Sequence, residues 1–292
     1  MTAHSDVLGV PPGARLLIVV AHPDDETIGA GGVLAANAPS PASGGGGKGP
    51  AEGGKGGGKV YGLRLIHLTD GAPRDGRDAA AAGCAGWQAY ADRRRGELQA
   101  ALAAAGFPPD HAESFGLPDQ QAAEHLEPLA LRLADRFAAL APDAVLTHPY
   151  EGGHPDHDAA AFAVRAACAL VARNGGRAPR LVEMAFYHHA TGTMTVQDFL
   201  PHAAFRARTV TLDEGLRAAK RRMLDAHASQ AEVLSLFGVE VERFRPAPPA
   251  DFTRPPHNGP LQYEEWGFAI DGTRWRRLAA AASAALGFEM GA

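Results

Sequence analysis

The sequence predicts an α/β protein in which helices cover both faces of a mostly parallel sheet, in three layers. Short apolar runs alternate with longer helical segments from residue 16 to residue 286, the order that parallel strands with crossover helices produce. Polar turns follow several apolar runs, and open parallel sheets bind ligands at that end of their strands. No internal repeat or linker divides the chain, so we expect one domain over residues 1–292.

Four strands are expected in the first half of the chain, each followed by a helix. The strands are expected at residues 16–21, 61–68, 113–116 and 143–147. The helices are expected at residues 26–36, 87–105, 127–140 and 154–173. Proline is tolerated in the first turn of a helix, which suits Pro128 and Pro155. Gly106 and Pro108 should end the second helix.

The second half continues the alternation and then becomes irregular. Strands are expected at residues 180–187 and 209–212, with a late strand at residues 261–268. Helices are expected at residues 213–237 and 275–286. Residues 246–292 form an irregular C-terminal extension, and its first part, residues 246–260, is rich in proline.

A Gly-rich segment at about residues 40–59 interrupts the first half of the chain. Each glycine has maximal backbone entropy to lose, so no packed element is expected there, and we predict a flexible surface insertion. A phosphate-binding loop is disfavoured, because the segment lacks the Gly-Lys-Ser/Thr ending and the fixed spacing of a P-loop.

The composition indicates a soluble protein without general affinity for polyanions. The net charge of -5 and the pI near 6.2 predict no attraction to nucleic acid or to acidic membranes. The two cysteines, Cys84 and Cys168, argue against a disulfide framework and suit a reducing compartment. With no basic leader and no apolar run of membrane-spanning length, we expect a cytoplasmic location. Whether the chain forms a homo-oligomer stays open.

The residues His22-Pro-Asp-Asp-Glu26 stand directly after the first strand and open the first helix. Two adjacent carboxylates and a histidine are costly to keep at such a turn unless they bind something, and a cation is the obvious candidate. Helix capping by Asp24 or Thr27 is the alternative. Capping explains one polar side chain but not four in five positions, so the motif predicts a site.

A second motif, His154-Pro-Asp-His157, follows the strand at residues 143–147 and opens the next helix. Its three-residue spacing places His154 and His157 on one helix face, so both imidazoles can address one point. A His-x-x-His pair alone is common by chance. Because this pair also follows a parallel strand, we expect both motifs to meet at one edge of the sheet.

Together the two motifs supply the donors of a catalytic metal site. His22, Asp25 and His157 would provide two imidazoles and one carboxylate, which is the donor number of a zinc site that leaves a position open for water. The same three donors also suit ferrous iron, Fe2+, so the presence of a metal is better indicated than its identity.

The remaining polar residues of the motifs suit hydrolysis of a carbonyl compound. Metal binding lowers the pKa of water towards about 7, and Asp24 is the candidate general base that takes its proton. His154 would stabilise the oxyanion or protonate the leaving amine. Asp156 would orient His154 and raise the pKa of its imidazole.

These motifs resemble the signature of the PIG-L/LmbE-like deacetylases, metal-dependent enzymes that hydrolyse N-acyl groups of amino sugars. The resemblance extends over residues 16–230, because three auxiliary motifs also match in order. These are Thr69-Asp-Gly71, Arg94-x-x-Glu97 and His227-x-Ser-Gln230. The two catalytic motifs together are highly specific, whereas any auxiliary motif alone would be weak.

The resemblance implies a Rossmann-like fold and one zinc ion, Zn2+, on the same three ligands, with the roles of Asp24 and His154 described above. It further implies that Arg94 helps to hold the sugar or an attached anionic group. The family's mycothiol deacetylase has a tyrosine two residues before the histidine that matches His154, where this chain has Gly152. Tyr150 is therefore the candidate for contact with the substrate carbonyl.

The predicted function is a zinc-dependent hydrolase in which metal-bound water removes the N-acetyl group of a GlcNAc-type sugar or sugar conjugate. An amidase that cleaves a bulkier acyl group from a glucosamine conjugate is the first alternative. A non-catalytic carbohydrate-binding relative is the second, and Asp24 argues against it because a binding protein needs no general base. The sequence leaves the sugar, its aglycone and the acyl length open.

Other conspicuous residues allow a structural explanation. Tyr263 and Trp266 are expected in the core or at a sheet edge rather than in a sugar-stacking platform. His227 and Gln230 lie one turn apart and are equally compatible with support of the site and with ordinary packing.

Overall fold

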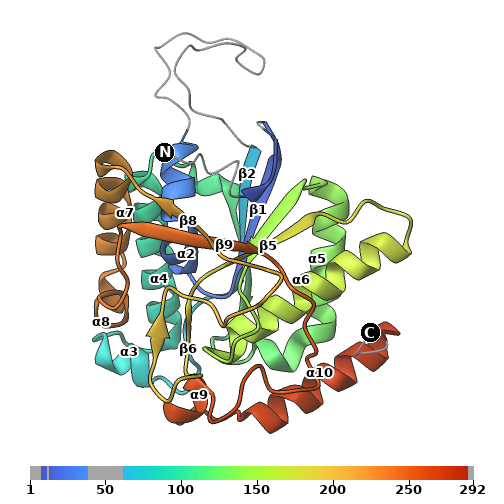
Figure 1. The fold of residues 1–292 in the computed structure, drawn as a ribbon. Helices are drawn as coiled ribbons and strands as arrows, with labels where there is room; N and C mark the ends of the chain where they lie inside the picture. Colours follow the sequence, from blue (N-terminus) through green and yellow to red (C-terminus); the bar gives the residue numbers. More distant parts are fainter. Residues whose placement is uncertain (1–7, 12, 39–61, 289–292) are drawn as a thin grey trace.

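The computed structural model describes residues 8–11, 13–38 and 62–288 (Figure 1). The Gly-rich segment at residues 40–59 lies outside these residues, so its predicted flexibility stays a prediction. The described part contains a seven-stranded sheet with the order β3-β2-β1-β4-β5-β9-β8. Every pair from β3 to β5 is parallel, and only β9 runs against its neighbours. The predicted α/β fold is confirmed.

The strands of this sheet agree with the apolar runs of the sequence, apart from β9. Their bounds are β1 Arg15–Val20, β2 Gly62–Thr69, β3 Ala112–Leu117, β4 Ala144–Thr147, β5 Arg180–Met184, β8 Arg208–Thr211 and β9 Val241–Pro246. Side chains alternate across a strand, so β1 contributes to both faces of the sheet. Ile18 and Val20 pack in one hydrophobic cluster and Leu17 and Val19 in the other.

Helices cover both faces of the sheet (Figure 1). One face carries α2 Asp25–Ala36, α4 Trp87–Ala104 and α7 Glu214–Ala226, and the other carries α5 Leu126–Leu140, α6 Pro155–Arg173 and α10 Gly272–Leu286. Shorter elements are α3 Arg77–Ala81, η1 Pro109–His111, η2 Ala122–His125, β6 Tyr187–His188, β7 Thr195–Val196, η3 Ala228–Gln230, α8 Ala231–Leu234 and α9 Gln262–Glu265. None of the described helices is long and apolar enough to cross a membrane.

Two predicted elements are wrong in detail, and one strand was not predicted. The helix expected over residues 213–237 breaks at His227, whose φ of -86° and ψ of 58° are not helical. Residues 241–246, for which no strand was predicted, form β9 between β5 and β8. The late strand expected at residues 261–268 is instead a turn around α9, in which the Glu264 carboxylate accepts from the Leu261 and Gly272 N–H groups.

A buried ion pair joins α7 to β9 beneath the first turns of α2. The Lys220 Nζ donates to Glu242 Oε1 and to the Ile28 carbonyl, each at 2.8 Å. Both charged side chains are 0% exposed. A Cβ at Gly31 would stand 3.0 Å from Lys220 Cγ, so this glycine leaves the room that the lysine stem needs.

Lys220→Met is expected to lower the free energy of unfolding by about 3–5 kcal/mol, because removing one partner leaves the Glu242 charge buried. Urea unfolding of the variant measures this loss. Arg221→Met on the exposed face of α7 is the matched control and should change stability by less than about 0.5 kcal/mol. Equal stabilities for the two variants would contradict a role for the pair.

Candidate metal centre and active site

The two motifs lie side by side because β1 and β4 are neighbouring parallel strands. His22 to Glu26 form the turn from β1 into α2, and His154 to His157 form the turn before and into α6. The imidazole centroids of His22 and His157 are 5.3 Å apart, and those of His22 and His154 are 4.5 Å apart. The edge of the sheet thus brings together three histidines from turns more than a hundred residues apart in sequence.

Asp25 lies between two of these histidines. Its Oδ2 is 3.2 Å from His22 Nδ1, and its Oδ1 is 3.2 Å from His157 Nε2. Burial acts to raise the pKa of Asp25, but the neighbouring histidines, His157 first, outweigh it and hold that pKa well below its usual range. The carboxylate is therefore ionised and ready to bind a cation.

These distances suit a metal ion. In a tetrahedral site with ligands about 2.0–2.1 Å from the ion, neighbouring donor atoms lie about 3.3 Å apart. Asp25 meets this spacing with both His22 and His157. Donor atoms of His22, His154 and His157 also lie within 4.8 Å of one another. The buried His/Asp cluster fits a metal, and the particular ligand set His22, Asp25 and His157 stays a prediction.

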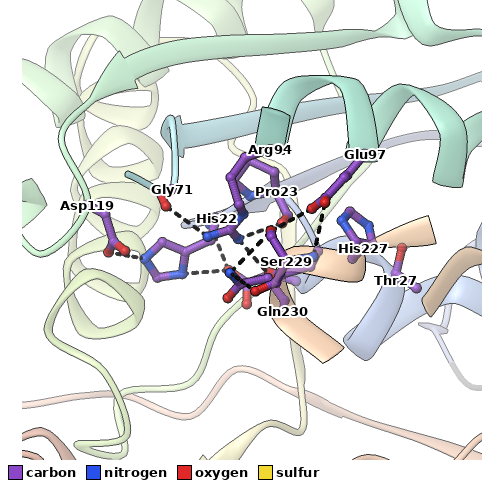
Figure 2. Close-up of polar contacts among 12 residues, drawn as sticks. His22, Pro23, Thr27, Gly71, Arg94, Glu97, Asp119, His227, Ser229 and Gln230 are labelled. Atoms are coloured by element: carbon purple, nitrogen blue, oxygen red, sulfur yellow. Dashed lines mark hydrogen bonds and ion pairs between the residues drawn. The ribbon is translucent and has the colours of Figure 1, made fainter. Parts of the chain in front are cut away.

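The second nitrogen of His22 faces two carboxylates. Its Nε2 is 2.9 Å from Asp119 Oδ1 and 3.3 Å from Asp156 Oδ2, and Figure 2 shows Asp119 pointing at the ring. Burial acts to lower the pKa of His22, but Asp119 and Asp25 outweigh it and raise the pKa well above its usual value. A carboxylate on the remote nitrogen is the usual support of a metal-bound imidazole, so Asp119 and Asp156 suit that role.

The structure corrects the expected contact between Asp156 and His154. The carboxylate of Asp156 accepts from the Gln120 and Ala122 N–H groups at 2.7 and 3.0 Å and turns towards His22. It is the backbone N–H of Asp156 that donates to His154 Nδ1, at 3.1 Å. Asp156 therefore orients His154 through its main chain, which leaves the His154 proton on Nε2.

Asp24 occupies a strained position in the turn. Its φ of 137° and ψ of -27° are unusual for a residue with a side chain. The Asp24 N–H donates to Glu26 Oε2 at 3.0 Å, and Glu26 in turn lies 3.0 Å from His67 Nε2. The Asp24 side chain makes no capping hydrogen bond to α2, so helix capping does not explain why an aspartate stands here.

The Arg94 side chain holds this turn through hydrogen bonds. Its NH1 donates to the Gly71 carbonyl at 2.8 Å, and its NH2 donates to the Pro23 carbonyl at 2.8 Å and to Asp24 Oδ2 at 3.0 Å (Figure 2). Burial raises the pKa of Asp24 to about 6, against the opposing effect of the Arg94 charge. The sequence predicts contact between Arg94 and the substrate. Because Arg94 is only 3% exposed, we propose that it positions Asp24 instead.

Tyr150 lies away from the histidines. Its hydroxyl donates to the Arg254 carbonyl at 2.9 Å, and its ring packs on Phe252 and Trp275. The tyrosine whose ring packs against His157 is Tyr187, with ring centroids 5.3 Å apart. The predicted contact of Tyr150 with a substrate carbonyl therefore lacks support from its surroundings.

The auxiliary motif around His227 ties α4 to the site. Glu97 accepts from Ser229 N and Oγ at 3.0 and 2.6 Å (Figure 2). Gln230 Nε2 donates to the Tyr90 hydroxyl at 2.6 Å. The fully buried His227 ring faces Glu26, with Nε2 3.8 Å from Oε1. These residues support the turn that carries Asp24. Support of the site was one of the two roles that the sequence left open for His227 and Gln230.

Two further residues of the cluster, Asp119 and His148, were assigned no role in the sequence analysis. Asp119 follows the end of β3 after one residue and His148 follows β4 directly, so the rule that singled out His22 would have found them. His148 Nε2 accepts from the Ala21 N–H at 3.1 Å, and its ring stacks on His157 at 3.9 Å. Its Nδ1 has no hydrogen-bond partner among the described residues, and donor atoms of Asp25, His148 and His157 lie within 4.8 Å of one another, so His148 is a further candidate ligand.

Gly153 lets the second motif approach β6. A Cβ at Gly153 would stand 2.3 Å from the Tyr187 carbonyl oxygen, which is backbone and cannot rotate away. Gly153→Ala is expected to lower the free energy of unfolding by about 1–3 kcal/mol and to displace His154. Gly96→Ala in α4, where a Cβ meets nothing, is the control and should stabilise by about 0.5–1 kcal/mol. Thermal unfolding distinguishes the two, and a neutral Gly153→Ala would contradict the close approach.

A comparison with known families gives the site its context. Residues 57–168 match the family described as PIG-L, GlcNAc-PI de-N-acetylase. The PIG-L match includes Thr69 to Gly71 and the second motif, whereas the first motif lies before it. The predicted resemblance is confirmed, and the predicted enzyme class, an N-deacetylase, agrees with this family.

Solved structures share the fold of this chain. The A40926 pseudoaglycone deacetylase superposes with a TM-score of 0.55 and 22% identity, covering 80% of this chain and 97% of its own. A deacetylase of teicoplanin biosynthesis gives a TM-score of 0.56 and 17% identity, with the same coverage. The zinc-inhibited form of teicoplanin deacetylase gives 0.54 and 15%, again with 80% and 97% covered. No curated protein sequence matches the chain.

Proposed function

We propose that the chain is a zinc-dependent hydrolase that removes the N-acetyl group of a GlcNAc-type amino sugar or sugar conjugate. The observation that carries this proposal is the position of Asp24. A buried carboxylate that caps no helix stands next to a metal-compatible carboxylate, Asp25, and is held by Arg94 in a strained turn. Strain of this kind persists at functional sites, where the surroundings over-determine it. The PIG-L match indicates which bond such a site cleaves.

The roles of the residues follow from their protonation. A divalent metal bound at the cluster lowers the pKa of water and polarises the amide carbonyl. Asp24, with its pKa at about 6, is largely ionised at neutral pH and can accept the proton of the attacking water. The same carboxyl group can then return that proton to the leaving amine. Asp24 thus acts as base and then as acid.

His154 suits the stabilisation of negative charge. Burial, together with the charge of His22, holds the pKa of His154 well below its usual value, so the ring is neutral. Its Nδ1 accepts from the Asp156 N–H, which leaves Nε2 as the donor. A fixed N–H donor is what a developing oxyanion requires. We therefore assign stabilisation of the oxyanion to His154 and the proton transfers to Asp24.

Release of acetate tests the proposed function directly. Metal-loaded protein should release acetate from GlcNAc, from glycosides of GlcNAc or from glucosamine-inositol conjugates, and a chromatographic assay would measure it. The same sugars carrying longer acyl groups distinguish the amidase, which should prefer them. Absence of hydrolysis with every acylated sugar, combined with measurable sugar binding, would contradict an enzyme and favour the carbohydrate-binding alternative.

A further inference from the structure

A pocket of about 420 Å³ opens beside the candidate metal centre. Asp119 lines it and at the same time stands 2.9 Å from His22 Nε2. Phe268 lines it too, and its ring lies edge-on to His154 with centroids 5.2 Å apart. The pocket therefore adjoins the site through Asp119 and Phe268, and its size lies within the range of small-molecule pockets.

The C-terminal extension supplies an aromatic wall to this pocket. Trp266 and Phe268 line it, with ring centroids 5.7 Å apart, and the Trp266 ring also contacts Tyr187 at 5.5 Å. Trp266 is nevertheless 39% exposed, which is unusual for so large an apolar side chain. Trp266 is the C-cap residue of α9, so it lies neither in the core nor at the sheet edge expected from the sequence.

The opposite wall is polar, and its arginines are already paired with carboxylates. Arg74 binds Asp70 with NH2 2.7 Å from Oδ2, and Arg77 binds Asp75 with Nε 2.6 Å from Oδ2. Arg274 forms the third pair, with Glu124. Three arginines thus face the pocket, each beside an acid.

Carboxylates outnumber these arginines in the pocket. Asp78 and Asp119 line it in addition to Asp75 and Glu124, and Asp78 forms no ion pair with the described residues. Burial raises the pKa of Asp78, and the charges of Asp119 and Asp75 raise it further. Asp119 is already paired with His22, so a phosphate or carboxylate entering here would meet three paired arginines and the Asp78 carboxylate.

We propose that this pocket is a subsite for an uncharged sugar residue linked to the amino sugar, and that Trp266 is its stacking platform. The inference rests on the proposed function, which places the N-acetyl group at the metal centre. The C–H face of a pyranose ring is apolar and suits the exposed indole, whereas its hydroxyl groups suit the amides and carboxylates opposite, such as Gln121 and Asp78. The preferred substrate is then a neutral oligosaccharide or glycoside rather than a sugar phosphate.

Substrate comparison with a Trp266 variant tests this subsite. Wild-type protein should have a higher kcat/KM for a 1,4-linked GlcNAc disaccharide than for GlcNAc, and the lowest for GlcNAc 1-phosphate. Trp266→Ala should lower the ratio of disaccharide to monosaccharide kcat/KM about tenfold, mainly through KM, and Trp266→Phe should restore most of it. Leu131→Ala, at a similarly exposed apolar residue on α5, is the control and should leave the ratio unchanged.

Binding measured without turnover separates this inference from the proposed function. Disaccharide should change the tryptophan fluorescence of the wild type, because Trp266 lines the pocket whereas Trp87 and Trp275 do not, and Trp266→Phe should abolish most of that change. Binding that depends on Trp266 without any acetate release would overturn the deacetylase and support the subsite. Equal disaccharide affinity in wild type and Trp266→Ala, or a preference for GlcNAc 1-phosphate, would overturn the subsite.

Discussion

Asp24→Asn is expected to lower kcat on the order of a hundredfold or more while the metal content stays the same. Asparagine keeps the size of the side chain and can still accept a hydrogen bond from Arg94, so the turn should persist. It cannot take the proton of the attacking water. KM should change little, because Asp24 is assigned to proton transfer and not to binding. Steady-state kinetics together with metal analysis measure both parts of the prediction.

Asp92→Asn is the matched control for this substitution. Asp92 is an exposed aspartate of α4 that pairs with Arg95 at 2.9 Å, far from any role in the site. Its kcat should stay within about twofold of the wild type. An Asp24→Asn enzyme with wild-type kcat would overturn the assignment of Asp24 as the proton acceptor, whatever the control showed.

Removal of the divalent metal is expected to abolish acetate release and to destabilise the protein. Chelation would take the ion from Asp25, His22 and His157, whose donor atoms are spaced as metal ligands are. A ligand that binds only the folded state at a hundred times its Kd stabilises that state by about 2.7 kcal/mol, so the Tm should fall on chelation. Added zinc should restore both activity and Tm, and ferrous iron is the second metal to try.

His157→Ala should reproduce the effect of chelation and make the Tm insensitive to added zinc. His111→Ala is the control, since His111 lies at the opposite end of the sheet, next to the start of β3, and its ring contacts Phe107. That variant should retain metal and activity. Full activity after verified loss of the metal would contradict the proposed function, and a zinc-dependent Tm in His157→Ala would contradict the ligand assignment.

The sheet and its site could be predicted because local signals carry them. Apolar runs of five to eight residues predict β1 and β2, and polar residues directly after β1 and β4 predict a site at their shared edge. Neighbouring positions in the sheet then bring His22 and His157 together, although they are far apart in sequence. No detailed knowledge of tertiary packing is needed for either step.

The elements that could not be predicted depend on distant partners. β9 runs Val241–Pro246 with charged residues at three of its six positions, and it is a strand because β5 and β8 lie on either side. The strand expected from Leu261 to Phe268 has a suitable pattern but becomes a turn, because the Glu264 side chain binds two backbone N–H groups. Arg94 on its helix resembles a surface residue in the sequence, and only the approach of the Pro23 turn shows it to be buried.

The backbone of Asp24 also bears on what the chain has been selected for. A residue with a side chain held at such a positive φ costs about 1–3 kcal/mol relative to an ordinary conformation, whereas glycine would relieve most of that penalty. A chain maintained merely as a scaffold or lectin would gain robustness from glycine at this position. An aspartate at this position agrees with the proton-transfer role that we propose for its side chain.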